Sequence, residues 1–86
     1  MHEAGITEDL IVAVQKALKD KKEDKMIKVV RVKLGKDGHV TDESLKYWFD
    51  HIKVDHADEY PTFKDAELDI VLVDGDDLSV TSVDLE

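Results

Sequence analysis

Apolar residues recur along this chain with two different periods. Between residues 6 and 18 the steps are three or four positions, which is the spacing of one apolar face on a helix: Ile6, Leu10, Ala13, Val14, Ala17 and Leu18. Thr7 is a candidate N-cap, with acidic residues behind it and lysines towards the end, although the helix can also begin at Glu3. The chain is therefore expected to open with a helix.

The period changes to two between Met26 and Leu34, and this alternation predicts a half-buried strand. Glycines at positions 35 and 38 interrupt it, and Thr41 follows as the expected cap of a second helix. The apolar face of that helix consists of Leu45, Trp48, Phe49 and Ile52. We assign its two aromatic rings to the core.

The polar stretch from Ile52 to Ala66 is interpreted as a helix end and a connecting loop. Two strands follow, at residues 68–73 and 78–85, and the turn Asp74–Asp77 between them predicts a β-hairpin. The apolar residues of the last strand change face between Val80 and Val83, so we expect a bulge or a frayed end. The turn lacks the glutamate and the length of a calcium loop, which favours a solvated hairpin tip.

The expected order is helix, strand, helix, strand, strand. This order predicts an α+β fold in which two helices cover one face of a three-stranded sheet. Eighty-six residues form one small domain, residues 1–86, because a second core would leave too little apolar surface for either half.

Composition narrows the possible functions. The formal charge of −9 argues against binding to nucleic acid, and no stretch resembles a signal peptide or membrane span, so we expect a cytoplasmic protein without a membrane partner. Cysteine is absent, which excludes a disulfide framework and a thiolate zinc site. No nucleophile with an adjacent base, phosphate-binding glycine loop or carboxylate pair stands out, so an enzyme is not expected.

The first three residues, Met1, His2 and Glu3, offer a nitrogen-rich set of metal ligands. The amine of Met1 and the amide and imidazole nitrogens of His2 can form fused chelate rings, with the carboxylate or amide of Glu3 beside them. Such donors in a planar arrangement suit Ni(II) or Cu(II) and fit poorly the oxygen cages of Ca(II) and Mg(II). The site requires an unmodified amino terminus. A histidine near the start of a chain is common, so the tripeptide by itself does not establish a metal site.

The other histidines are weaker candidates for metal ligands. His51 and His56 have carboxylates nearby, but a spacing of five residues does not place two ligands on one helical face. His39, beside the turn glycines, is interpreted as a surface residue.

Several short motifs, in this order, resemble the nickel-binding domain of the HypA/HybF family over nearly the whole chain. They are Met1-His2-Glu3 before an apolar helix, the strand ending at residues 30–35 (VRVKLG), residues 43–45 (ESL) with Tyr47 and Phe49, and residues 66–68 (AEL) opening a strand. The resemblance implies a nickel metallochaperone for the maturation of nickel–iron hydrogenase or urease. It further implies Met1, His2 and Glu3 as the nickel ligands, and a HypB-like GTPase and a hydrogenase large subunit or urease as partners.

The chain departs from that family where its members insert a zinc domain with paired CxxC motifs. Here only the turn Asp74–Asp77 connects the last two strands, so no zinc site is expected. Two hypotheses follow: a nickel-binding accessory protein that holds Ni(II) at its N-terminal tripeptide, or a metal-independent protein-interaction module that keeps the fold without regulated nickel transfer.

Overall fold

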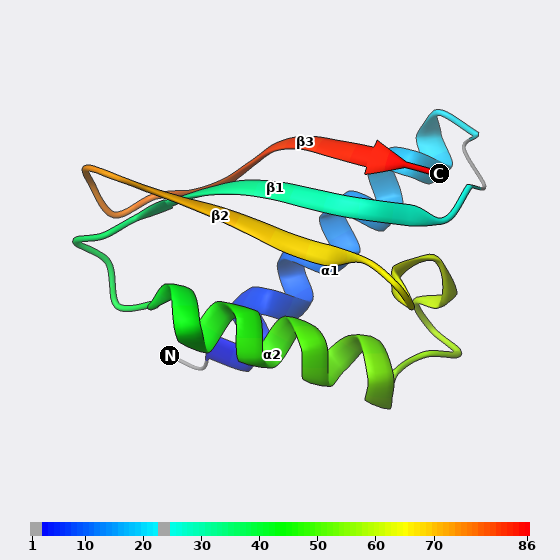
Figure 1. Cartoon of the computed structure of the whole chain (residues 1–86), viewed down its shortest axis with the longest axis horizontal. Helices are drawn as coiled ribbons and strands as arrows, with labels where there is room; N and C mark the ends of the chain where they lie inside the picture. The colour runs from blue at the N-terminus through cyan, green and yellow to red at the C-terminus, as the bar shows by residue number, and fades with distance from the viewer. Residues whose placement is uncertain (1–2, 23–24) are drawn as a thin grey trace.

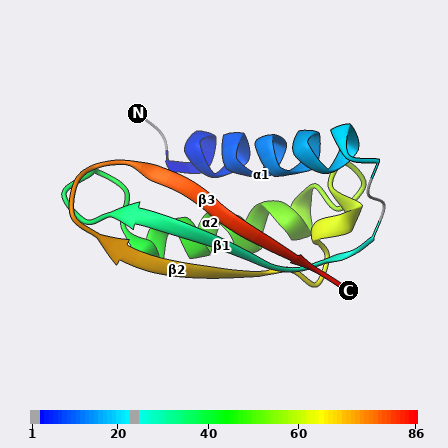
Figure 2. The same cartoon turned by 90° about the horizontal axis from the view of Figure 1, so that it is seen from above.

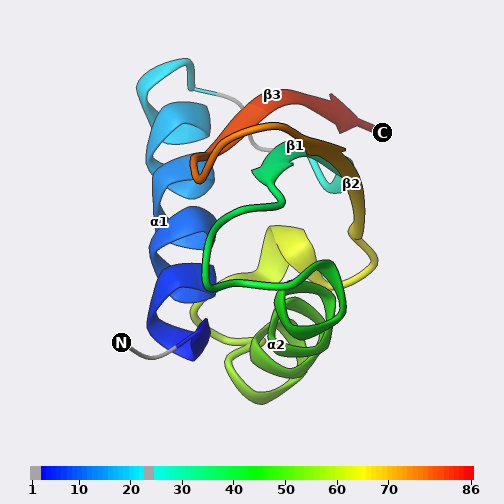
Figure 3. The same cartoon turned by 90° about the vertical axis from the view of Figure 1, so that its left-hand side faces the viewer.

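The computed structural model describes residues 3–22 and 25–86, apart from the side chains of Glu3 and Ala4. Two helices and three strands form the fold in the predicted order. Both helices lie on the same, concave face of the sheet (Figure 1, Figure 3). The elements are α1 (Glu3–Asp20), β1 (Ile27–Gly35), α2 (Asp42–Asp55), the short 3-10 helix η1 (Pro61–Phe63), β2 (Glu67–Val73) and β3 (Leu78–Leu85). The α+β prediction is confirmed.

The sheet has β1 at its centre, in the order β2-β1-β3. β1 runs parallel to β2 and antiparallel to β3, so the last two strands flank β1 and do not form the predicted hairpin. The physical reason is burial. β1 carries the fully buried Val30 and Val32, whereas the exposed positions of β2 and β3 are compatible with the edges of a sheet.

The turn between β2 and β3 crosses the end of β1, as Figure 2 shows from above. The amide of Gly35 donates to the carbonyl of Asp77 at 2.7 Å, and the amide of Asp37 donates to the carbonyl of Gly75 at 2.9 Å. The amide of Gly75 donates in return to Oδ2 of Asp37 at 3.2 Å. A Cβ at Gly35 would lie 2.4 Å from the Gly75 carbonyl oxygen, so this crossing requires glycine.

A bulge in β3 restores the phase of its apolar residues. The register moves by one between the pairs Arg31–Ser82 and Val32–Val80, which leaves Thr81 as the extra residue. The Thr81 hydroxyl donates to the carbonyl of Arg31 at 3.2 Å. As a result Leu78, Val80 and Val83 pair with buried residues of β1 on the helix-facing side, and a second register shift, between Ile27 and Val29, pairs Leu85 with the buried Ile27. Of the two alternatives predicted for this strand, a bulge or a frayed end, the structure has the bulge.

Helix α1 begins at Glu3, so Thr7 is a buried helical residue and not an N-cap. The buried face of α1 is Thr7, Leu10, Ile11 and Val14, and Ala13 and Ala17 of the predicted apolar face are exposed. Ile11, which the predicted face left out, is fully buried. The face is therefore rotated from the prediction, because the alanines are small enough to face solvent at little cost.

Helix α2 matches its prediction more closely. The side chain of Thr41 caps it by accepting a hydrogen bond from the Ser44 amide at 3.1 Å, and Leu45, Phe49 and Ile52 are buried. Trp48 packs partly buried against the core. In the described residues no helix is both long enough and apolar enough to cross a membrane.

The segment between α2 and β2 has a mostly polar sequence, but two of its aromatic side chains are buried in the core. Tyr60 and Phe63 are buried, and Phe63 packs edge-on against Phe49 with ring centroids 6.2 Å apart. The predicted helix end and connecting loop agree with the end of α2 at Asp55, but the prediction did not include the short 3-10 helix or the two aromatic side chains that anchor this segment to the core.

Candidate metal centre

The predicted nickel ligands are the two residues that precede α1 in the sequence and the first residue of that helix. Met1 and His2 lie outside the described residues, and of Glu3 the structure describes only the main chain, which begins α1. Helix α1 is anchored by the buried residues Thr7, Leu10 and Ile11. The tripeptide therefore adjoins a packed helix.

The connection between β1 and α2 passes beside the first turns of α1 (Figure 3). Ile6, one turn after His2 in the sequence, lines a hollow of about 260 Å³ together with Asp37, His39 and Asp76. Two acidic side chains and an imidazole are thus placed close to the start of α1. They come from two connections that are far apart in the sequence, and the crossing at Gly35 brings them together.

This neighbourhood was not predicted from the sequence. His39 was interpreted as a surface residue, which agrees with its exposure, and Asp76 as part of a hairpin tip. The glycines at positions 35 and 38 indicated that β1 ends here in a turn. They did not indicate which other segment approaches this turn, because that depends on the strand order.

The histidines of the α2 region each have a carboxylate partner. Nε2 of His51 lies 2.8 Å from Oδ2 of Asp55, and Nδ1 of His56 lies 3.1 Å from Oε1 of Glu59. The hydrogen bond to Glu59 raises the pKa of His56 above its ordinary value. Among the side chains that the structure describes, those of residues 5–22 and 25–86, no group of three or more histidine, aspartate or glutamate residues is arranged to hold a metal ion. The structure therefore does not bring His51 and His56 together as a site.

The outer face of the sheet carries a separate cluster of charges. Arg31 at the centre of β1 forms ion pairs with Asp69 of β2 and Asp84 of β3. The hydrogen bond to Asp84 raises the pKa of Arg31 above its ordinary value. These carboxylates are compensated by Arg31 and are poor candidates for a cation site.

Comparison with known proteins identifies the family. A family model described as "Hydrogenase/urease nickel incorporation, metallochaperone, hypA" matches residues 1–76, a range that includes the N-terminal tripeptide and ends in the turn before β3. No curated protein sequence matches the chain.

Two solved structures share the fold. The solution structure of the nickel metallochaperone HypA from Helicobacter pylori superposes with a TM-score of 0.81 at 18% identity, over 99% of this chain and 97% of that chain. A second HypA solution structure gives a TM-score of 0.75, also at 18% identity, over 100% of this chain and 97% of that chain. The family match over most of the sequence, together with this fold, shows that the chain belongs to the HypA family of nickel metallochaperones for hydrogenase and urease maturation.

Proposed function

We propose that this protein carries Ni(II) as cargo at Met1, His2 and Glu3 and releases it to a partner during the maturation of hydrogenase or urease. The observation that carries the proposal is the family match, which begins at residue 1 and so includes all three ligands. The start of α1 at Glu3 supports it, because a packed helix holds one end of the tripeptide.

The chemistry of the three residues suits nickel. The amine of Met1 and the nitrogens of His2 supply donors of the kind that Ni(II) binds in planar geometry, and Glu3 supplies a carboxylate or an amide beside them. These ligands must lose protons before they bind. Nickel affinity is therefore expected to fall as the pH drops through the titration range of His2.

The surroundings of α1 add an electrostatic contribution. The N-terminus of a helix carries a partial positive charge, which opposes a bound cation. Asp37 and Asp76 in the adjacent hollow oppose that effect, and the net charge of −9 attracts cations over a longer range. An acidic environment around a chelating tripeptide favours capture of Ni(II) and still permits its transfer by ligand exchange.

The partners proposed are those of the family function. A HypB-like GTPase would act with the protein, and a hydrogenase large subunit or urease would receive the ion. The chain has no cysteine, and β2 connects to β3 through residues 74–77 alone. In this proposal nickel transfer proceeds without a thiolate-bound zinc module between β2 and β3.

Calorimetric titration of Ni(II) tests the proposal. It requires untagged protein whose mass confirms an intact Met1, compared with His2→Ala and with a form extended by two residues at the amino terminus. Both changes are expected to eliminate most binding. His56→Ala is the matched control, because it removes an exposed histidine that is paired with Glu59, and it should leave the affinity unchanged.

Equal nickel affinity in all four proteins would refute the tripeptide as the site. The alternative function, a metal-independent interaction module, would then gain support if capture of a HypB-like GTPase also proved insensitive to chelator and to His2→Ala.

A further inference from the structure

The free edge of β3 carries little of the charge that usually protects an edge strand. Within the described residues β3 pairs with β1 alone, its residues 78–83 (LSVTSV) carry no charge, and its one charged residue, Asp84, is held in an ion pair with Arg31. The opposite edge strand, β2, carries Glu67 and Asp69. Edge strands without charge or proline are sites at which another strand can pair.

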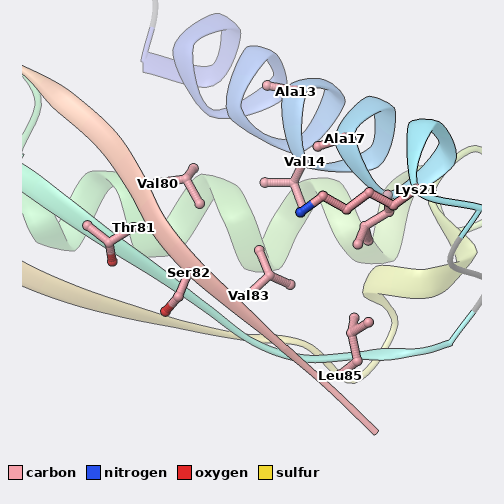
Figure 4. Close-up of a pocket in the computed structure, with 10 residues that line it drawn as sticks. Ala13, Val14, Ala17, Lys21, Val80, Thr81, Ser82, Val83 and Leu85 are labelled. Carbon is pink, nitrogen blue, oxygen red and sulfur yellow. The ribbon is translucent and has the colours of Figure 1, made fainter.

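A groove runs between this edge and α1 (Figure 4). Its volume is about 610 Å³. On the strand side the bulge at Thr81 directs Val80, Val83 and Leu85 towards the groove, and on the helix side Ala13 and Ala17 leave room beside them. Because the helix residues here are small, the apolar side of β3 is only partly covered by α1. The side chains of an added strand would cover the rest.

Lys21, at the end of α1, supplies the charge in this groove. It is the charged member of the ten lining residues, and Figure 4 shows its side chain extending beside Val14. Within the described part of the chain it forms no ion pair. A cationic side chain in an apolar groove is complementary to a segment with apolar residues and one carboxylate.

We propose that the β3 edge and this groove bind an extended segment of a partner protein. The segment adds a strand to the sheet beside Ser82–Leu85, places alternate apolar side chains against Val83 and Leu85, and sets a carboxylate beside Lys21. The unpaired backbone groups of the edge strand form hydrogen bonds with a partner segment only when that segment is extended. The groove then contacts the side chains on one face of the bound segment and determines which residues fit there. The bulge at Thr81 interrupts the ladder, so pairing is confined to the C-terminal part of β3.

A second copy of this chain fits the surface less well. The acidic residues near the free edge are Asp84 and Glu86, at the C-terminal end of β3. That end of β3 and the end of α1 that bears Lys21 lie at the same end of the molecule (Figure 2), and Leu85 and Lys21 line the same groove. An antiparallel copy of β3 that pairs over the same residues would point its acidic end towards the bulge at Thr81, away from Lys21, and two copies with a charge of −9 each would repel.

Three synthetic peptides test the proposal. Each peptide has a core of eight residues in which valine and threonine alternate. The peptides differ only in the residue added at both ends, which is glutamate, glutamine or lysine. We expect the glutamate peptide to bind most tightly, by about two- to five-fold over glutamine, as for an exposed ion pair. Amide hydrogen exchange at residues 82–85 should slow when it binds.

Variants separate the contributions of charge and edge. Lys21→Glu should reverse the order of the peptides, whereas Lys19→Glu, an exposed residue of the same helix end that does not line the groove, should preserve it. Val80→Lys, in the part of the groove beyond the pairing segment, should weaken binding of the glutamine peptide by removing an apolar contact, with an unchanged circular dichroism spectrum showing that the fold is kept.

Three results would overturn the proposal. They are equal affinity for the three peptides, slowed exchange at the β2 edge in place of β3, and slowed exchange at β3 that depends on protein concentration without peptide. The last result would assign the edge to a second copy of the chain.

Discussion

Replacing Phe63 with alanine tests the packing of a segment whose sequence predicts only a loop. Phe63 is fully buried, and its ring contacts those of Phe49 and Tyr60 edge-on, with centroid distances of 6.2 and 6.3 Å. Burial of a phenylalanine contributes about 1.5–3 kcal/mol. The cavity left by Phe63→Ala brings the expected loss of unfolding free energy to about 3–5 kcal/mol.

That loss is large for a domain of this size. At roughly 0.05–0.15 kcal/mol per residue, the whole chain is stabilised by about 4–13 kcal/mol. The melting temperature of the Phe63→Ala variant should fall on the order of 10–40 °C.

Urea denaturation measures the effect, with the fluorescence of Trp48, the single tryptophan, and far-UV circular dichroism as two probes. Val54→Ala is the matched control, because Val54 is 69% exposed and its truncation should change stability by less than about 0.5 kcal/mol. A loss below about 1 kcal/mol for Phe63→Ala would contradict the anchoring of this segment in the core.

Three further predictions concern the turn, the helix cap and a histidine. Gly35→Ala should destabilise the fold by about 1–3 kcal/mol, measured by urea denaturation, because its Cβ would meet the Gly75 carbonyl, and unchanged stability would contradict that close approach. Thr41→Ala should cost about 1 kcal/mol through the lost cap, whereas Thr41→Ser should retain most of it. NMR titration of His56 should give a pKa above the ordinary value, and Glu59→Gln should lower that pKa. The contribution of the His56–Glu59 interaction to the free energy of unfolding is present at low pH and is lost as the pH rises through the pKa that His56 has in the folded protein. An unchanged titration in Glu59→Gln would rule out the hydrogen bond as the cause.

The spacing of apolar residues and the residues at helix caps and turns predicted the main helices and strands of this fold well. The alternation at Val30 and Val32 identified β1, Thr41 identified the start of α2, and the change of face between Val80 and Val83 identified the bulge in β3. Each of these signals depends on residues close together in the sequence. For that reason they could be recognised without knowing the tertiary structure.

The strand order and the burial of particular side chains could not be predicted in the same way. A turn between two strands usually indicates a hairpin, yet here Asp74–Asp77 carries the chain across the end of β1 because β1 buries the most apolar surface. The burial of Thr7 and Phe63 likewise depends on which elements pack together. The hollow beside α1 with Asp37 and Asp76 follows from the same strand order, so the sequence did not indicate it.

Binding of Ni(II) at the start of α1 can be tested by NMR mapping. One equivalent of Ni(II) is added to ¹⁵N-labelled protein with an intact amino terminus, and the perturbed amides are assigned. We expect changes confined to the first turn of α1 and to residues 37–40 of the adjacent connection. Changes centred on His51 and His56, with the first turn of α1 unaffected, would contradict it.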